Sequence, residues 1–191
     1  MGNDRRLPER IYLDEFGGNY KLYMDAVYAI FERDFVKSKA MFGSNKLNMK
    51  FHPKYQERAY TFYHMTHEGE DEDNRRPDLR RCECIPWTKP SIQNTEFWNL
   101  RFWHQKRKTA NRICICLDNE EGVDYYVILD VRATYVLLWT AFVSTHKHEI
   151  NKKDAEYLRW KEEVNGKEYT PDSLIKEIQE GINKQGPLPV P

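Results

Sequence analysis

Three short apolar runs between Asn111 and Val143 constrain the fold of this chain more than any other stretch. The runs are rich in β-branched and aromatic residues, and turn-forming clusters at 119–122 and 131–133 separate them. Short runs of this composition between turn signals predict strands that pair with their neighbours in sequence order. The sequence therefore predicts a three-stranded antiparallel meander.

The first run is apolar on both sides of the predicted strand. Ile113 and Ile115 alternate with Cys114 and Cys116, so the side chains on both faces avoid water. A strand with two apolar faces has to be covered on both. We therefore expect an α+β fold, with helices packed on a twisted antiparallel sheet that ends in the three-stranded meander.

Thr140 interrupts the apolar pattern of the third run. Simple alternation places it on the face that carries Leu138 and Phe142, where its hydroxyl is the only one. One interpretation is a functional hydroxyl at the end of a strand. The other is a β-forming residue whose hydroxyl is satisfied by a neighbouring group.

The remainder of the chain contributes mostly helices. Apolar residues at helical spacing predict helices over 19–37 and 152–165. A Thr-Pro pair, suited to the N-cap and the first helical position, predicts a further helix over 170–185. Residues 95–108 fit a short amphipathic helix, and residues 59–66 fit a strand or an ordered loop.

A chain of 191 residues is long enough for one domain with an ordinary core. In chain order we expect a flexible arm (1–18), a single α+β domain (19–185) and a tail (186–191). Within the domain we expect an N-terminal helical extension (19–58), a core (59–165) and a C-terminal helix (170–185).

The bulk composition argues against several classes of protein. The 30 basic and 30 acidic residues cancel, so the total charge does not favour a nucleic-acid partner. No apolar run approaches the ~20 residues that a membrane span needs. The start of the chain lacks the apolar core of a secretory signal. We therefore expect a cytoplasmic protein with no membrane partner.

The cysteines form two Cys-x-Cys pairs, Cys82 with Cys84 and Cys114 with Cys116. Their apolar surroundings indicate small buried hydrophobic side chains in a reducing compartment. The alternative is a zinc site built from both pairs. No histidine or carboxylate cluster has metal-ligand spacing and no glycine-rich nucleotide loop is present, so we expect no metal and no cofactor.

Positive charge is concentrated in one segment. Between Arg75 and Arg112 there are ten basic and three acidic residues, an excess of seven positive charges, interleaved with five aromatic rings. Clustered cations and flat rings suit a phosphate backbone and unstacked bases. Alternatively, the arginines pair with the acidic run at 68–73 that precedes them.

Two of the six histidines are candidates for chemistry. His64 lies among apolar neighbours that would hold its ring still, and His104 lies at the edge of the basic segment. An imidazole titrates near neutral pH and serves as general acid or base, although a structural hydrogen bond is the alternative role. RNA carries its own nucleophile, the 2′-hydroxyl. Its attack on phosphorus needs a base, a cation and an acid, but no metal.

Three short motifs carry a resemblance to a known superfamily. They are His64-Met-Thr66 within an aromatic run, Asp78-Leu-Arg-Arg-Cys-Glu-Cys-Ile85 followed by Trp87, and Leu138-Trp139-Thr140-Ala141. Over roughly residues 60–160 the chain resembles the barnase, EndoU, colicin E5/D and RelE (BECR) superfamily of small ribonucleases and toxins, and in particular its phage-associated branch. The chain departs from it in its N-terminal helix and its neutral total charge.

The resemblance implies a metal-independent endoribonuclease that leaves a 2′,3′-cyclic phosphate, and a phage- or prophage-associated toxin. It implies His64 as general base or acid, Arg81 as a clamp on the phosphate and Thr140 as a catalytic hydroxyl. The implied partners are RNA and a cognate antitoxin or immunity protein. Together with the basic segment, the resemblance gives the candidate RNA-binding residues Arg80, Trp103, His104, Lys106, Arg107, Arg112 and Arg132. The competing hypothesis is a non-catalytic phage module or inhibitor that binds RNA or protein.

Overall fold

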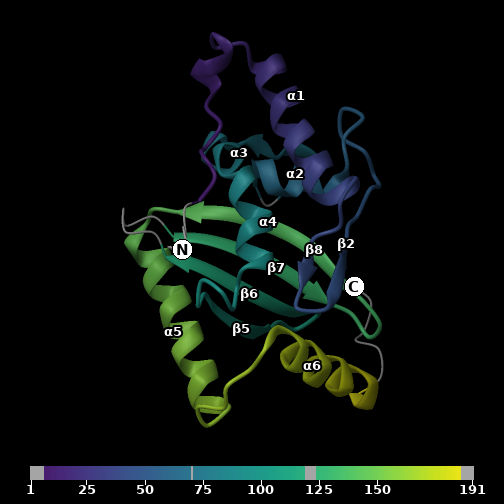
Figure 1. Ribbon diagram of the computed structural model, residues 1–191, viewed down its shortest axis with the longest axis vertical. Coiled ribbons are helices and arrows are strands. Elements are labelled where there is room, and N and C mark those ends of the chain that lie inside the picture. Colours follow the sequence, from purple (N-terminus) through teal and green to yellow (C-terminus); the bar gives the residue numbers. More distant parts are fainter. Residues whose placement is uncertain (1–6, 70, 119–123, 186–191) are drawn as a thin grey trace, which may run out of the picture.

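The computed structural model describes residues 7–69, 71–118 and 124–185 and is built around a six-stranded sheet (Figure 1). The strand order is β1-β2-β8-β7-β6-β5. Its strands are β1 (Met41–Phe42), β2 (Asn45–Asn48), β5 (Arg101–Lys106), β6 (Asn111–Asp118), β7 (Asp124–Val131) and β8 (Val136–Ser144). Neighbouring strands pair antiparallel except β2 and β8, which are parallel. The α+β prediction is confirmed, and the sheet is mixed where a purely antiparallel one was expected.

Helices and short turns surround the sheet (Figure 1). They are η1 (Leu13–Phe16), α1 (Tyr20–Phe31), η2 (Glu32–Val36), α2 (Tyr60–Thr66), η3 (Glu72–Asn74), α3 (Leu79–Glu83), α4 (Ile85–Gln93), α5 (Lys147–Glu163) and α6 (Pro171–Gln185). A separate two-stranded ribbon joins β3 (His67–Glu68) to β4 (Arg76–Pro77). Within the described ranges, every helix is too short or too polar to cross a lipid bilayer.

Different helices cover the two faces of the sheet. Tyr125 of β7 is buried toward α4, where its hydroxyl oxygen lies 2.5 Å from that of Thr88. The next residue, Tyr126, points to the opposite face, where the ammonium of Lys153 in α5 lies 6.0 Å from its ring centroid. The cover on both faces is what the two apolar faces of β6 require.

A β-bulge in β8 changes which side chains share a face. Leu138 and Thr140 pair with adjacent residues of β7, so Trp139 is the extra residue of the bulge. Thr140 therefore shares a face with Phe142 but not with Leu138, contrary to the expectation from simple alternation.

Two local predictions were wrong. Residues 60–66, expected as a strand or loop, form α2; all seven of them are buried, and a helix satisfies buried backbone groups within itself. Residues 101–106, expected within an amphipathic helix, form the edge strand β5, which pairs with β6 along its whole length. Strand pairing and the burial of Trp103 beneath α5 outweigh the local helical spacing.

The N-terminal arm expected to be flexible is packed from residue 7 onward. The indole nitrogen of Trp87 donates to the Pro8 carbonyl at 2.8 Å, and the Ile11 amide donates to the Glu83 carbonyl at 3.2 Å. The helical extension expected over 19–58 supplies β1 and β2 as well as α1. Residues 1–6 and the predicted tail 186–191 lie outside the described residues.

Asp172 fastens α6 to the hairpin of β1 and β2. Its Oδ1 accepts hydrogen bonds from the Ser44 amide at 2.9 Å, the Ser44 hydroxyl at 2.7 Å and the Asn45 side chain at 2.7 Å. We expect Asp172→Ala to lower the free energy of unfolding by about 1–2 kcal/mol, because three donors lose their acceptor. Urea unfolding measures the loss. Glu180→Ala, an exposed substitution on the same helix, is the control, and an equal loss in both variants would contradict the role of Asp172.

Candidate functional site

The imidazole of His64 lies in a buried cluster between α2 and β8. The residue is 3% exposed, and its ring centroid lies 4.4 Å from that of Tyr60 and 5.3 Å from that of Trp139. The Nε2 atom lies 3.5 Å from Oε1 of Glu72, whose side chain is 54% exposed. Among the described residues Nε2 has no hydrogen-bond partner. The imidazole is therefore buried beside a carboxylate that is partly exposed to solvent.

The environment sets the charge of both groups at neutral pH. Burial, with the positive charge of Arg75 as the next cause, lowers the pKa of His64 to about 4. A hydrogen bond from the Tyr60 hydroxyl, at 2.5 Å, holds the pKa of Glu72 below its usual value. At pH 7 the imidazole is therefore neutral and the carboxylate is ionised.

The residues predicted to act with His64 lie beside it, but they contact its main chain. The Thr140 hydroxyl donates to the His64 carbonyl oxygen at 2.8 Å. A guanidinium nitrogen of Arg81 lies 3.5 Å from the same oxygen and 3.4 Å from the His67 carbonyl. Thr140 and Arg81 thus fix the C-terminal half of α2, and these donors are directed at the backbone.

Three cations surround the His64 cluster. The ammonium of Lys50 lies 4.4 Å from the Tyr60 ring centroid, and the guanidinium of Arg112 lies 5.1 Å from that of Trp139. The positive charge of Arg75 adds to burial in lowering the pKa of His64. The Nε atoms of Arg75 and Arg112 are buried without a hydrogen-bond partner among the described residues. This arrangement provides positive charge beside an ionised carboxylate and a neutral imidazole.

Sequence reasoning missed Glu72, Tyr60, Lys50 and Arg75. Glu72 belongs to an acidic run whose composition indicates a solvated loop. No motif or spacing distinguishes Lys50, which follows β2, or Arg75 at the start of the basic segment. Only the helical state of 60–66, which puts Tyr60 one turn before His64, would have linked the two side chains.

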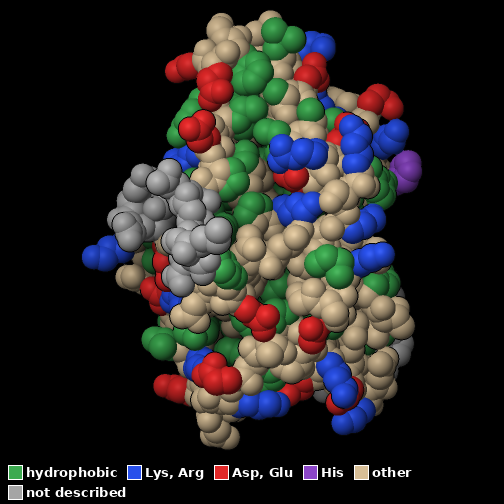
Figure 2. Space-filling model, viewed as in Figure 1, with side chains coloured by type: hydrophobic (Ala, Val, Ile, Leu, Met, Phe, Trp, Pro, Cys, Tyr) green, Lys and Arg blue, Asp and Glu red, His purple; other side chains and the backbone are tan. Residues whose placement is uncertain are grey.

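Several predicted RNA-binding residues lie elsewhere. Trp103 is 1% exposed and packs on Tyr157 of α5, so its ring is not accessible to a base. The Nε2 of His104 lies 3.1 Å from the Asn111 side-chain oxygen. The guanidinium of Arg132 pairs with buried Asp130 at 2.6 Å. The positive segment therefore does not form one continuous surface, and Figure 2 shows Lys and Arg interspersed with Asp and Glu on the face in view.

The other predicted RNA-binding residues remain accessible. Arg80 and Arg107 line a groove of about 450 Å³ between α3 and α5. Lys106 is exposed at the end of β5. Arg112 is half-buried beside Trp139.

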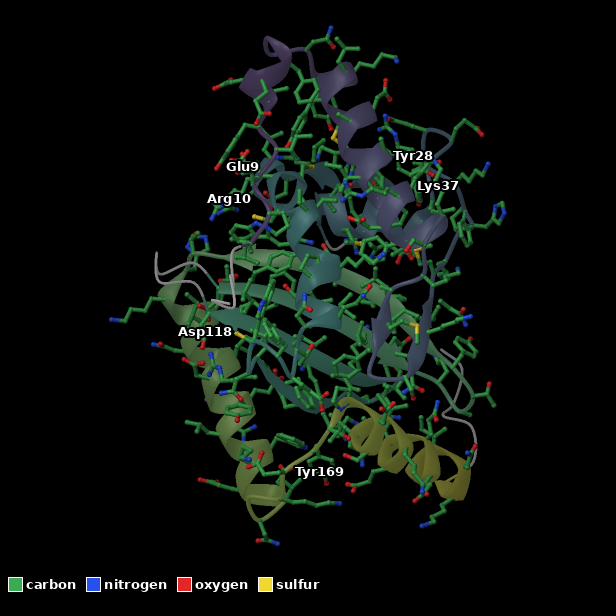
Figure 3. All side chains as sticks on the ribbon, viewed as in Figure 1. Glu9, Arg10, Tyr28, Lys37, Asp118 and Tyr169 are labelled. Carbon is green, nitrogen blue, oxygen red and sulfur yellow. The ribbon has the colours of Figure 1, made fainter. Side chains whose placement is uncertain are left out.

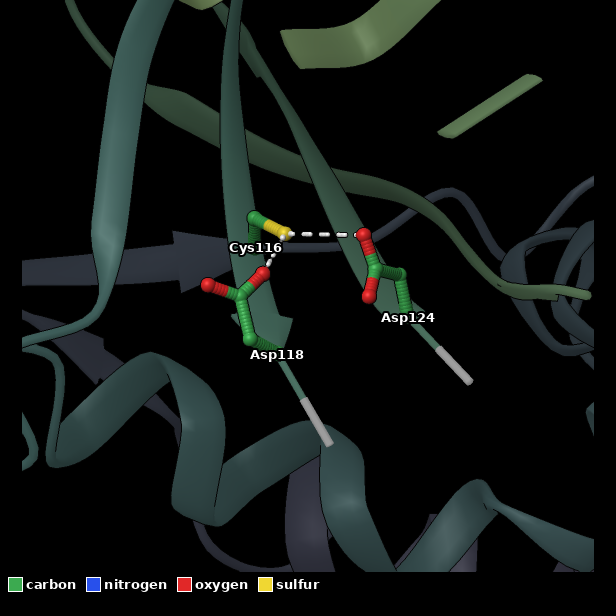
Figure 4. A group of neighbouring side chains, drawn as sticks. All are labelled: Cys116, Asp118 and Asp124. Carbon is green, nitrogen blue, oxygen red and sulfur yellow. Dashed lines mark hydrogen bonds between the residues drawn. The ribbon is translucent and has the colours of Figure 1, made fainter. Parts of the chain in front are cut away.

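One group in the described part of the chain brings three candidate metal-ligating atoms together. The Cys116 sulfur lies 3.2 Å from Oδ1 of Asp118 and 3.9 Å from Oδ2 of Asp124 (Figure 4). Asp118, at the end of β6 (Figure 3), already accepts from Arg101 at 2.6 Å, and Asp124 accepts from the Tyr126 hydroxyl at 2.8 Å. The carboxylates are thus engaged by protein donors, which makes this group an ion-pair network.

The group of Cys116, Asp118 and Asp124 contains a single cysteine, so it is not the zinc site considered for the two cysteine pairs. Cys82 is buried in α3, where its sulfur lies 3.8 Å from the Met24 sulfur and 3.7 Å from the Thr66 carbonyl oxygen. Burial raises the pKa of the Cys82 and Cys84 thiols to about 12. These contacts fit the interpretation of the cysteines as small buried side chains.

Loss of the Thr140 hydroxyl is expected to loosen α2. Thr140→Val keeps the shape of the side chain but leaves the His64 carbonyl with only the long contact to Arg81. We expect the free energy of unfolding to fall by about 1–2 kcal/mol, measured by urea unfolding. Thr109→Val, at an exposed position in the turn after β5, is the control. No difference between the two variants would contradict the positioning role.

Two histidines whose pKa is lowered in the folded chain contribute to the pH dependence of stability. Burial lowers the pKa of His64 and of His67 to about 4, whereas an unfolded chain has the ordinary value of 6.5. Between these values the unfolded chain binds protons that the folded chain does not, so stability falls as the pH drops through this window. We expect His64→Gln to reduce the slope of unfolding free energy against pH between about pH 6.5 and 5. His148→Gln, at an exposed position, should leave the slope unchanged, and an unchanged slope in the His64 variant would refute the burial of a neutral ring.

Comparison with protein-family models, with curated proteins and with solved structures finds no match for this chain. A functional assignment therefore depends on the side chains themselves. Among the described residues, His64 and Glu72 form the pair best suited to acid–base chemistry, and nearby cations act on it. Arg81 and Thr140 contact the main-chain carbonyl of His64.

Proposed function

We propose that this chain is a metal-independent endoribonuclease that cleaves RNA by attack of the 2′-hydroxyl. One observation carries the proposal: the Nε2 of His64, which has no hydrogen-bond partner among the described residues, lies 3.5 Å from the ionised, half-exposed Glu72, and the charges of Lys50 and Arg75 act on both groups. The same histidine is the one that the resemblance to the BECR ribonucleases singles out. Acid, base and cation are the three components that this reaction needs.

The exposed carboxylate is the group that meets the substrate. Glu72 accepts the proton of the 2′-hydroxyl, the bond from the 2′-oxygen to phosphorus forms, and the bond from phosphorus to the 5′-oxygen breaks. The proton then returns from the Glu72–His64 pair to the leaving 5′-oxygen. The products are a 2′,3′-cyclic phosphate and a 5′-hydroxyl, so atoms and charge balance without a further reactant.

Substrate binding changes the acidity of the imidazole. Burial and the cations Arg75 and Lys50 lower the pKa of His64 in the free protein. A phosphodiester beside these cations adds a negative charge and raises that pKa. His64 therefore becomes able to share a proton with Glu72 when RNA is bound.

Arg81 and Thr140 act as positioning residues in this proposal. Their donors fix the carbonyl of His64, which sets the distance between Nε2 and the Glu72 carboxylate. The Tyr60 hydroxyl donates to the same carboxylate oxygen, Oε1, that lies nearest to Nε2 of His64. A pair held in this way has little reorganisation to complete during the reaction.

A non-catalytic RNA-binding protein is the second candidate function. The observation in its favour is that His64 is only 3% exposed and that Arg81 and Thr140 point their donors at the main chain. In that case the cations would bind RNA, and Glu72 and His64 would serve only the packing of α2. Turnover distinguishes the two functions.

The decisive experiment incubates the purified protein with a short single-stranded RNA in excess EDTA. We expect cleavage, with a 2′,3′-cyclic phosphate identified by mass spectrometry. Glu72→Gln removes the proton acceptor but keeps the shape, and should reduce the rate by about 100-fold or more. Thr140→Ser keeps the donor and should retain most of the rate.

Glu9→Gln is the matched control, because Glu9 is an exposed carboxylate on the N-terminal segment (Figure 3). RNA binding without cleavage by the wild type would favour the second candidate. Equal cleavage by the Glu72 and Glu9 variants would remove Glu72 from the mechanism, and neither binding nor cleavage would exclude both functions.

A further inference from the structure

A groove of about 450 Å³ lies between α3 and α5, on the face of the sheet that α5 covers. Its walls are α5 on one side and α3 with its preceding turn on the other, and β8 contributes Phe142 to its floor. It carries five cations: Arg80, Arg81, Arg107, Lys152 and Lys153. Ligand pockets of proteins have volumes of this order.

Four acidic residues line the groove, and three of them accept hydrogen bonds from protein donors; the fourth, Glu68 of β3, is exposed. Glu156 accepts from Gln105 at 2.5 Å and pairs with Lys153 at 3.2 Å and Arg107 at 3.3 Å. Glu149 accepts from the Ser144 hydroxyl at 2.8 Å. Asp78 caps α3 by accepting from the Arg80 amide at 3.0 Å. These three acids therefore fix the walls, and the five cations exceed the four acids of the groove by one positive charge.

Two cations on opposite walls are weakly held. Lys152 of α5 is exposed and forms no ion pair with the acids in the described part of the chain. Arg80 of α3 has only long contacts, at 3.5 Å to Asp78 and 3.4 Å to the Thr145 hydroxyl. A phosphate between α3 and α5 would meet a cation from each side, which is a favourable geometry for an anion.

Arg81 connects this groove to the proposed catalytic pair. Its guanidinium lines the groove and lies 5.5 Å from the Phe142 ring centroid, while one nitrogen lies 3.5 Å from the His64 carbonyl. Arg81 therefore links the groove to the main chain of α2, the helix that carries His64. A chain with phosphates at regular intervals can occupy both places, whereas a ligand with a single phosphate cannot.

We propose that the groove binds the sugar-phosphate backbone of single-stranded RNA next to the phosphodiester that is cleaved. This inference rests on the proposed ribonuclease function and adds a second subsite, with Arg80 and Lys152 as its phosphate contacts. Phosphate contacts of this kind strengthen binding without selecting a base. The groove thus favours substrates longer than a dinucleotide.

The test uses the full-length double variant Arg80→Ala/Lys152→Ala and two RNA probes, a fluorescent single-stranded oligonucleotide and a dinucleotide. We expect the oligonucleotide to bind about tenfold more weakly, and the slope of log affinity against log salt to fall by about 0.7 for each lost contact. Cleavage of the dinucleotide, which does not reach the groove, should be unchanged. The control is Arg159→Ala/Lys176→Ala, which removes the same charges at exposed positions of α5 and α6.

Each outcome decides the groove independently of the ribonuclease function. Equal affinities for the two double variants, or no RNA binding by the wild type, would refute the proposal that the groove binds the RNA backbone. Loss of oligonucleotide affinity in a protein that cleaves neither probe would support the groove and refute the nuclease. Binding of a phosphoserine peptide in place of RNA, lost in the same variant, would overturn the RNA assignment. Urea unfolding of both double variants confirms that they remain folded.

Discussion

The packing of α2 against β8 is the interaction on which the rest of the site depends. The bulge at Trp139 turns the Thr140 hydroxyl toward α2, where it donates to the His64 carbonyl. Arg81 reaches the same carbonyl from α3. A buried carbonyl without donors would be costly, so these contacts hold the helix in one place. The distance between the imidazole and the Glu72 carboxylate follows from that placement.

Charge in this protein is organised in compensated pairs, and the exceptions mark the candidate sites. Arg101 bridges Asp118 and Asp154, and Arg132 pairs with Asp130. Between residues 75 and 112 such pairs neutralise only part of the local excess, because Arg101 and Arg107 pair with acids outside that segment whereas Arg80 and Arg81 share Asp78 within it. Positive charge remains beside the His64 cluster and in the groove between α3 and α5. At both places in the described part of the chain a polyanion would meet clustered cations, which in the groove stand beside four acidic side chains.

Burial gives His64 properties that neither its sequence position nor its ordinary pKa would suggest. A ring sealed between Tyr60 and Trp139 is neutral at physiological pH and cannot exchange protons freely with solvent. Its Nε2 lies 3.5 Å from Oε1 of the half-exposed Glu72. In the proposed reaction, His64 therefore exchanges its proton with Glu72 and does not contact the substrate. The pair holds the proton only while the RNA phosphate offsets the charge of the nearby cations.

The sequence alone determined the α+β class, the central strands with two apolar faces and the helix at the C-terminus, whose N-cap at Thr170 is confirmed by a bond from the Ser173 amide. These features depend on residue spacing and capping, which act over a few positions. The sequence also singled out His64, Arg81 and Thr140, three residues that the fold brings into contact.

Only the tertiary structure decided that these residues meet at a main-chain carbonyl, and that Glu72 is the neighbour of the imidazole. The bulge in β8 reverses the face of Thr140, and a one-residue insertion of this kind leaves no mark in an apolar run. The helical state of α2 and the strand state of β5 were likewise decided by burial and pairing with distant segments. Strong local patterns determine which elements form, whereas long-range packing determines which side chains face one another.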